Sequence, residues 1–279
     1  MLYILGAVLI WAFFNGVLVK SIKTSGVGVG FWTAVMGVIF YLGDKFKISD
    51  LYGLNESQLL ALACLGVFAG LNNACYYTAL KISIPNAALF HYMAPLLIVV
   101  WILLIPAFNA PVPFIAFVAL IIGFFGTAYV AAPSLKEGNW KLILLGSGSA
   151  IFYSLEIILA GYLSQKLNIA PEISSFTKLL FQAIVMLAVS VTAKESIGIR
   201  SGSDMLKIAL GGVLLYLSFV LYFTGSADPG VSDLDRGILS YIDRIGAIAL
   251  GAWIFKEKIT RNIWIGGALI LSASLLIII

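Results

Sequence analysis

Residues 86–105 read NAALFHYMAPLLIVVWILLI, a run of 20 residues without a single Asp, Glu, Lys or Arg. A helix needs about 20 mainly apolar residues to cross the hydrocarbon core of a bilayer. Nine further runs of this kind follow one another along the chain, at 2–19, 26–42, 58–79, 113–132, 142–161, 174–193, 205–225, 232–254 and 262–279. The sequence therefore predicts an all-α integral membrane protein with ten transmembrane helices.

The composition excludes several classes of protein. Of the 279 residues, 61% are hydrophobic and 11% are charged, whereas soluble domains run at about 45–50% and about 25%. So little charge cannot cover a water-exposed globular surface. An ordinary soluble enzyme, a disordered chain and a nucleic-acid binder with a dense basic face are excluded. The lipid bilayer is the expected surroundings, and a multi-pass position in the cell membrane is the expected location.

The loops between the runs differ in charge. Those after runs 1, 3, 5, 7 and 9 hold Lys20, Lys23, Lys81, Lys136, Lys141, Lys194, Arg200, Lys207, Lys256, Lys258 and Arg261. The other loops hold only Lys45, Lys47 and Lys166. Basic loops tend to remain in the cytoplasm. The charge pattern therefore places both chain ends outside.

The second half of the chain resembles the first. At an offset of 146, Tyr76 aligns with Tyr222, and at an offset of 149, Tyr92 aligns with Tyr241. We interpret the halves as two copies of one five-helix unit, over residues 1–133 and 140–279. Because each copy holds an odd number of spans, the copies must lie in opposite orientations. Inverted repeats of this kind are typical of secondary transporters, whose binding site lies between the repeats.

Run 232–254 carries the most polar face. Ser232, Arg236, Ser240 and Asp243 recur every three or four residues, and Arg244 flanks them. A charge at mid-bilayer costs about 2.5–3.5 kcal/mol, so such residues usually line a polar pathway. Adjacent residues do not face one another on a helix, so Asp243 and Arg244 should each have another partner. Arg244 would meet a carboxylate or phosphate, and Asp243 an amine or proton; the alternative is a structural ion-pair network.

Two further runs carry charges at matching depth. Glu156 lies five residues before the end of run 142–161, and Lys178 four residues after the start of run 174–193. A short loop joins these ends, so the side chains should pair or share water, as a substrate contact or as a structural ion pair.

His91 would relay a proton or serve as a core residue. Pro95 frees the carbonyl of residue 91 and should kink the helix.

Five short segments resemble known motifs: Trp11 with the residues that follow it to Asn15-Gly16, Tyr77-Thr78-Ala79-Leu80, Tyr92-Met93-Ala94-Pro95, Phe255-Lys256-Glu257-Lys258-Ile259-Thr260 and Gly266-Gly267-Ala268-Leu269-Ile270. By these segments the chain resembles the drug/metabolite transporter superfamily, in its EamA-like branch. It departs from the family at Arg244, where Pro is usual, and lacks the Arg common in span 2. The resemblance implies export, both termini in the cytoplasm (opposite to the charge pattern), and a central cavity between spans 3, 4, 8 and 9.

Carried across by position, the resemblance and the polar faces predict the residues that bind substrate. They are Asn72, Asn73, Tyr76, His91, Tyr92, Tyr216, Tyr222, Tyr241, Asp243 and Arg244. The candidates for proton coupling or ion pairing are Asp243, Glu156, Lys178 and Arg236. The aromatic members would serve equally well in packing.

We therefore expect a secondary active transporter that exports small polar metabolites, such as amino acids, by alternating access. One alternative is an organic phosphate or nucleotide-sugar exchanger, with Arg244 on the phosphate. Another is a proton-coupled pump for cationic drugs that uses Asp243 or Glu156. The sequence has no HExxH motif, no Walker loop and only one His, so we expect no enzyme, catalytic residue, metal or cofactor. The expected partners are a small-molecule substrate, lipid and protons, and the chain would act as a monomer or homodimer.

Overall fold

The computed structural model describes residues 1–43, 51–105 and 114–276. Lys45, Lys47 and the last three residues of run 262–279 lie outside the described residues. Every regular element in the described ranges is a helix. The prediction of an all-α fold is confirmed for that part of the chain.

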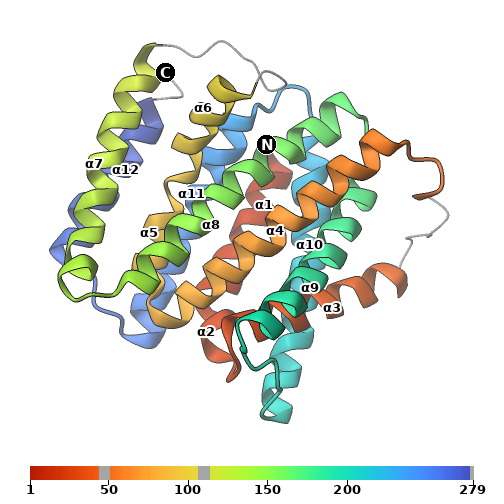
Figure 1. The fold of residues 1–279 in the computed structure, drawn as a ribbon, viewed down its shortest axis with the longest axis horizontal. Coiled ribbons are helices and arrows are strands. Elements are labelled where there is room, and N and C mark those ends of the chain that lie inside the picture. Colours follow the sequence, from red (N-terminus) through yellow and green to blue (C-terminus); the bar gives the residue numbers. More distant parts are fainter. Residues whose placement is uncertain (44–50, 106–113, 277–279) are drawn as a thin grey trace.

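The helices follow the predicted apolar runs in order (Figure 1). Their bounds are α1 (Leu2–Phe13), η1 (Phe14–Leu18), α2 (Val19–Ser21), α3 (Gly26–Gly43), α4 (Glu56–Ile82), α5 (Ile84–His91), α6 (Ala94–Leu104), α7 (Phe114–Lys136), α8 (Trp140–Gly161), η4 (Tyr162–Lys166), α9 (Pro171–Thr192), α10 (Gly202–Ser226), α11 (Asp233–Phe255) and α12 (Arg261–Leu276). Among the described residues, eight helical segments are long and apolar enough to cross a membrane. The helices α7 and α12 occupy the other two predicted runs, and ten spans stay a prediction.

Three of the spans contain irregular turns, and in the sixth the π-helical segment η4 continues α8 directly. The fourth is interrupted after His91 and resumes at Ala94, as predicted from Pro95, which has no backbone N–H to donate. In the first span, the π-helical segment η1 continues α1 directly. A π turn shifts the register of the side chains that follow, and such turns recur at functional sites. The first span can therefore direct successive side chains toward different neighbours.

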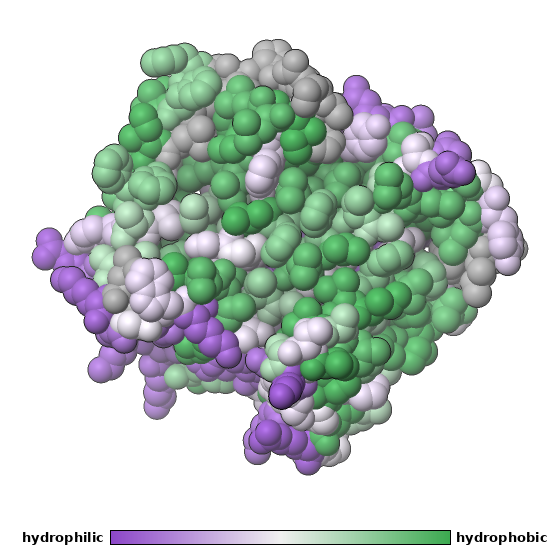
Figure 2. All heavy atoms as spheres, viewed as in Figure 1, coloured by the Kyte–Doolittle hydropathy of each residue, from purple (hydrophilic) through white to green (hydrophobic). Residues whose placement is uncertain are grey.

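The outer surface is apolar around the middle of the molecule. Figure 2 shows hydrophobic residues across the centre of the face and hydrophilic ones at its lower left, lower and upper right edges. Large side chains such as Phe124, Leu144 and Trp264 are exposed on the outside. A surface of this extent would be unfavourable in water but suits contact with lipid.

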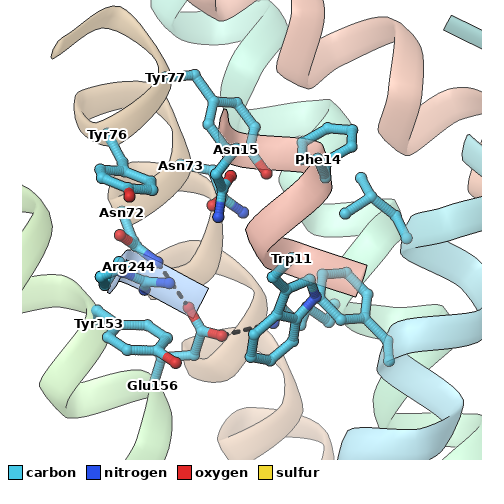
Figure 3. Close-up of a pocket in the computed structure, with 13 residues that line it drawn as sticks. Trp11, Phe14, Asn15, Asn72, Asn73, Tyr76, Tyr77, Tyr153, Glu156 and Arg244 are labelled. Atoms are coloured by element: carbon cyan, nitrogen blue, oxygen red, sulfur yellow. Dashed lines mark hydrogen bonds and ion pairs between the residues drawn. The ribbon is translucent and has the colours of Figure 1, made fainter. Parts of the chain in front are cut away.

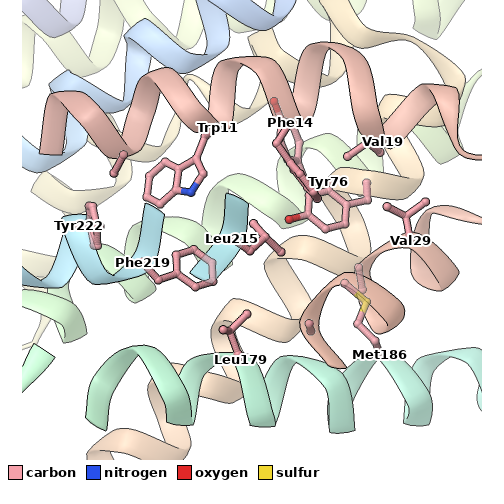
Figure 4. Close-up of a cluster of buried hydrophobic side chains, with 14 of the residues drawn as sticks. Trp11, Phe14, Val19, Val29, Tyr76, Leu179, Met186, Leu215, Phe219 and Tyr222 are labelled. Atoms are coloured by element: carbon pink, nitrogen blue, oxygen red, sulfur yellow. The ribbon is translucent and has the colours of Figure 1, made fainter. Parts of the chain in front are cut away.

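Helices of the two halves pack against each other rather than forming separate bodies. The helix α1 packs on α10 and α11, and α8 packs correspondingly on α4 and on α5 and α6. In the same way α3 packs on α10 as well as α9, α9 packs on α4, and α7 packs on α12. Figure 4 shows the shared core, where Trp11 and Phe14 meet Leu215, Phe219 and Tyr222 of α10.

Five connections lie together at one end of the bundle, which we call the basic end. It is formed by residues 20–25, 81–84, 137–141, 193–207 and 256–260. Side-chain contacts join these segments to one another: Lys20 pairs with Glu257, Lys81 donates to the carbonyl of Ile22, Lys207 donates to the carbonyl of Ser21, and Lys141 pairs with Glu195. Loops that follow alternate spans therefore meet on one side, as helices that cross back and forth require.

Candidate functional site

A small cavity lies at the centre of the bundle (Figure 3). Its volume is about 30 Å³, enough for water, since one molecule needs about 10–15 Å³ of such space. The lining comes from α1, η1, α4, α8, α9, α10 and α11, through Trp11, Phe14, Asn15, Asn72, Asn73, Tyr76, Tyr77, Tyr153, Glu156, Lys178, Leu215, Phe219 and Arg244. The cavity therefore draws on both halves of the chain.

The first ion pair at the cavity joins α8 to α9. Lys178 Nζ lies 2.5 Å from Glu156 Oε1, and each residue is 2% exposed. Asn72 Nδ2 donates to the other carboxylate oxygen over 3.1 Å, as Figure 3 shows. The Lys178 ammonium also lies 3.7 Å from the ring centre of Phe219. The prediction that the two charges lie close enough to pair is confirmed.

The second ion pair lies within α11. Arg244 Nη1 contacts Asp243 Oδ2, and Asn15 Nδ2 donates to the same oxygen over 3.2 Å. The expectation that the two neighbours would have separate partners is wrong for Arg244, because its long side chain bends back to the adjacent carboxylate. The guanidinium carbon lies 5.0 Å from the ring centres of both Tyr76 and Tyr153, and Figure 3 shows it between the two rings. These rings stabilise the cation by cation–π attraction.

Neutral polar groups complete the surroundings of the cavity. Asn73 Nδ2 donates to Gln182 Oε1 over 2.8 Å, which joins α4 to α9. Trp11 Nε1 donates to Ser218 Oγ over 2.8 Å, which joins α1 to α10. Buried polar groups are costly unless they are hydrogen-bonded, so these bonds hold the cavity in a defined shape.

The structure brings about half of the predicted site residues to the cavity lining. They are Asn72, Asn73, Tyr76, Glu156, Lys178 and Arg244. Asp243, which is fully buried, adjoins them through its ion pair with Arg244. Tyr222 lies one layer further out, with its ring centre 5.2 Å from that of Trp11.

His91 lies behind the lining. Its ring centre is 4.5 Å from those of both Tyr76 and Tyr153. Its Nδ1 lies 2.9 Å from Ser149 Oγ, whose hydroxyl donates to the carbonyl of Gly146 over 2.7 Å. His91 therefore positions the two rings that hold Arg244. Those rings lie between His91 and the cavity, so the predicted contact of His91 with substrate is not present in this conformation.

Tyr92 and Tyr241 lie away from the cavity lining and contact each other. Tyr241 OH donates to the carbonyl of Tyr92 over 2.9 Å, and Tyr92 OH donates to the carbonyl of Tyr241 over 3.5 Å. Tyr216 instead packs edge-on against Tyr41, with ring centres 4.6 Å apart. These three tyrosines serve helix packing in this conformation.

Arg236 lies at the start of α11, apart from the cavity. It donates to the carbonyls of Val231 over 2.9 Å and Ser226 over 3.3 Å, and it pairs with Asp233. These contacts brace the connection between α10 and α11. The position of Arg236 does not support a role in proton coupling.

Seven lining residues were not predicted from the sequence: Trp11, Phe14, Asn15, Tyr77, Tyr153, Leu215 and Phe219. Polar spacing offered a signal for some of them, because Trp11 and Asn15 lie four residues apart and Tyr153 lies three before Glu156. The expected span set of 3, 4, 8 and 9 also needs correction. Among the described residues, spans 3, 8 and 9 do line the cavity, spans 1, 6 and 7 line it as well, and span 4 contributes none of the lining.

Comparison with known proteins identifies the family. The model of the EamA-like transporter family matches residues 140–279, which is half of the chain. The chain belongs to the EamA-like transporter family. This family is part of the drug/metabolite transporter superfamily, whose EamA members are transporters. With its eight apolar helices among the described residues, this EamA-like protein is a multi-pass membrane protein.

Solved structures share the fold of this EamA-like protein. One, titled only "Crystal structure of protein", superposes with a TM-score of 0.62 at 16% identity, over 100% of this chain and 97% of its own. At that identity the likeness shows the fold alone. A search of the curated proteins finds no match.

The central site of this EamA-like protein combines two acids with two bases. Asp243 and Glu156 are offset by Arg244 and Lys178, so the formal charge of the group is zero. In the ranges that the structure describes, no three His, Cys, Asp or Glu side chains gather as metal ligands. What these two ion pairs can do chemically is recognise a charged group in a site that is shielded from water.

Proposed function

We propose that the protein is a secondary active transporter in the cell membrane that exports small zwitterions, such as amino acids, by alternating access. One observation carries the proposal: two buried ion pairs, Glu156–Lys178 and Asp243–Arg244, adjoin the same central cavity. A zwitterion carries one group for each sign of charge. Its carboxylate would meet Arg244 or Lys178, and its ammonium would meet Glu156 or Asp243.

Charge balance favours a zwitterion over the alternatives. A substrate phosphate would add two negative charges to a group whose formal charge is zero, and a lipophilic cation would add one positive charge. Excess charge in a desolvated site is costly. A zwitterion exchanges partners with the existing pairs and leaves the total unchanged. The organic phosphate exchanger and the cationic drug pump therefore rank below the amino-acid exporter.

Alternating access would require the two halves to move relative to each other. The cavity of about 30 Å³ is too small for an amino acid, so a substrate would enter only after the helices around it separate. The packing in the two halves is matched, because α1 packs on α10 and α11, and α8 packs on α4 and α5. This correspondence supports two equivalent units. The reciprocal bonds between Tyr92 and Tyr241, which align in the repeat, support a twofold axis between them. We therefore retain ten spans and two inverted repeats as part of the proposal.

A single chain supplies the whole cavity lining, so we propose that a monomer is sufficient for transport. A homodimer would hold two independent sites. Proton movement would occur through Glu156 or Asp243, the carboxylates that adjoin the cavity.

The test is counterflow in proteoliposomes. Purified protein is reconstituted with a mixture of unlabelled amino acids inside, and entry of each labelled amino acid is measured with and without a pH gradient. Parallel vesicles are loaded with organic phosphates or with a lipophilic cation. Protein-dependent exchange of amino acids supports the proposal. Exchange confined to phosphates, or efflux confined to the cation, would refute the substrate class while leaving the transporter family intact.

A further inference from the structure

A second pocket lies at the basic end, outside the central cavity. Its volume is about 470 Å³, and its walls include Lys20, Lys23, Lys81 and Arg200. We propose that this pocket binds a phosphate group, carried either by an anionic lipid headgroup or by a soluble phosphate. The proposal is independent of the substrate of the central cavity.

The pocket collects positive charge from four separate segments. Lys20 belongs to α2, Lys81 to α4, and Lys23 and Arg200 to the connections before α3 and α10. Among the described residues, an ion pair holds only one of these four cations, Lys20, whose partner is Glu257. Phosphate is recognised by such convergent Lys and Arg donors.

The hydrogen bonds at the edge of the pocket do not neutralise its excess of positive charge. Lys207 and Lys81 donate to the carbonyls of Ser21 and Ile22, but an ammonium has three donors. Asp204 accepts from the backbone N–H of Lys23 over 3.1 Å. The four lining cations and Lys207 beside them therefore outnumber the two carboxylates that contact these segments, those of Asp204 and Glu257.

The wall that carries Arg200 is fixed by hydrogen bonds. Ser25 Oγ donates to the carbonyl of Ser196 over 2.8 Å, and Thr24 Oγ1 donates to the same oxygen over 3.3 Å. Trp32 Nε1 donates to the carbonyl of Ile197 over 2.7 Å. The connection between α9 and α10 is thus held against the start of α3, whose N-terminal dipole also favours an anion. The pocket is formed before a ligand arrives.

The location suits a lipid headgroup. The cations lie at the ends of apolar helices, which is the level at which phosphates border the hydrocarbon core. Figure 1 places α2 and the connection between α9 and α10 at the lower edge of the view, and Figure 2 shows hydrophilic residues along that edge. Anionic lipid would reach the pocket from the side, and soluble phosphate from the water.

The test compares two double variants of the full chain. Lys23→Gln/Arg200→Gln removes two exposed charges that line the pocket, and the matched control Lys136→Gln/Lys258→Gln removes two exposed charges at the same end that do not. Native mass spectrometry measures binding of phosphatidylglycerol against phosphatidylcholine, and calorimetry measures binding of inorganic phosphate. Thermal unfolding verifies that both variants remain folded.

We expect the pocket variant to bind phosphatidylglycerol roughly 30-fold more weakly and the control to bind it as the wild type does. A selective loss confined to phosphatidylglycerol identifies the lipid headgroup as the ligand. Selective loss of inorganic phosphate binding identifies the soluble anion. If the two variants bind both probes equally, general surface charge accounts for binding and the proposal is overturned.

Discussion

Replacement of Lys178 by Met tests whether the buried ion pair is a true charge pair. Met matches the length of the Lys side chain, so the change removes the ammonium while it keeps most of the packing. Glu156 would then remain buried, at 2% exposure, with only Asn72 donating to it over 3.1 Å. Loss of one partner of a buried pair costs about 3–5 kcal/mol. For a chain of this size, that predicts a fall in Tm of roughly 6–20 °C.

The assay is thermal unfolding of purified protein in detergent, with two comparisons. The double variant Glu156→Gln/Lys178→Met removes both charges, and its Gln still accepts from Asn72, so most of the lost stability should return. Lys141→Met breaks a pair with Glu195 whose N–O distance is 3.9 Å and whose lysine side chain is 65% exposed; it should cost at most about 1 kcal/mol. A charge pair is contradicted if Lys178→Met unfolds at the wild-type temperature, or if the double variant loses as much stability as its two single variants together.

Three further changes test the cavity and the interface between the halves. Arg244→Gln should abolish amino-acid counterflow, and Asp243→Asn/Arg244→Gln should regain stability in thermal unfolding without regaining transport; normal flux in either variant would contradict the assigned site. Tyr241→Phe removes a 2.9 Å hydrogen bond and should lower the free energy of unfolding by about 0.5–1.5 kcal/mol, measured by denaturant titration; an unchanged midpoint would mean that the bond contributes nothing. Gly16→Ala would place its Cβ 2.8 Å from the α11 backbone and should destabilise the protein by about 1–3 kcal/mol, whereas Gly202→Ala, with nothing within 4 Å, should be close to neutral in the same titration.

The pairing of Glu156 with Lys178 could be predicted because it depends on depth alone. Both residues lie a few positions from ends that a short loop joins, so the chain itself brings them to the same level. The ion pair between Asp243 and Arg244 could not be predicted in that way. Helical spacing places the two α-carbons, but the surroundings decide where a long side chain points. Here the rings of Tyr76 and Tyr153 confine the guanidinium beside the adjacent carboxylate.

The contact of the first span with Asp243 was also not predicted from the sequence. Asn15 donates to Asp243, which lies 228 positions further along the chain. The contact therefore depends on how α1, η1 and α11 cross.

Length and apolarity are local properties, and a bilayer responds to them span by span. The order of residues along the chain was therefore enough to predict an all-helical membrane protein, the approximate bounds of its helices and the charges that such helices bury. Which helices surround the cavity, which neutral side chains hold its ion pairs, and how small the cavity is depend on contacts between residues far apart in the chain. Those contacts exist only once the two halves have packed together, because the first half supplies Asn15, Asn72 and Tyr76, which contact the charged groups of the second half.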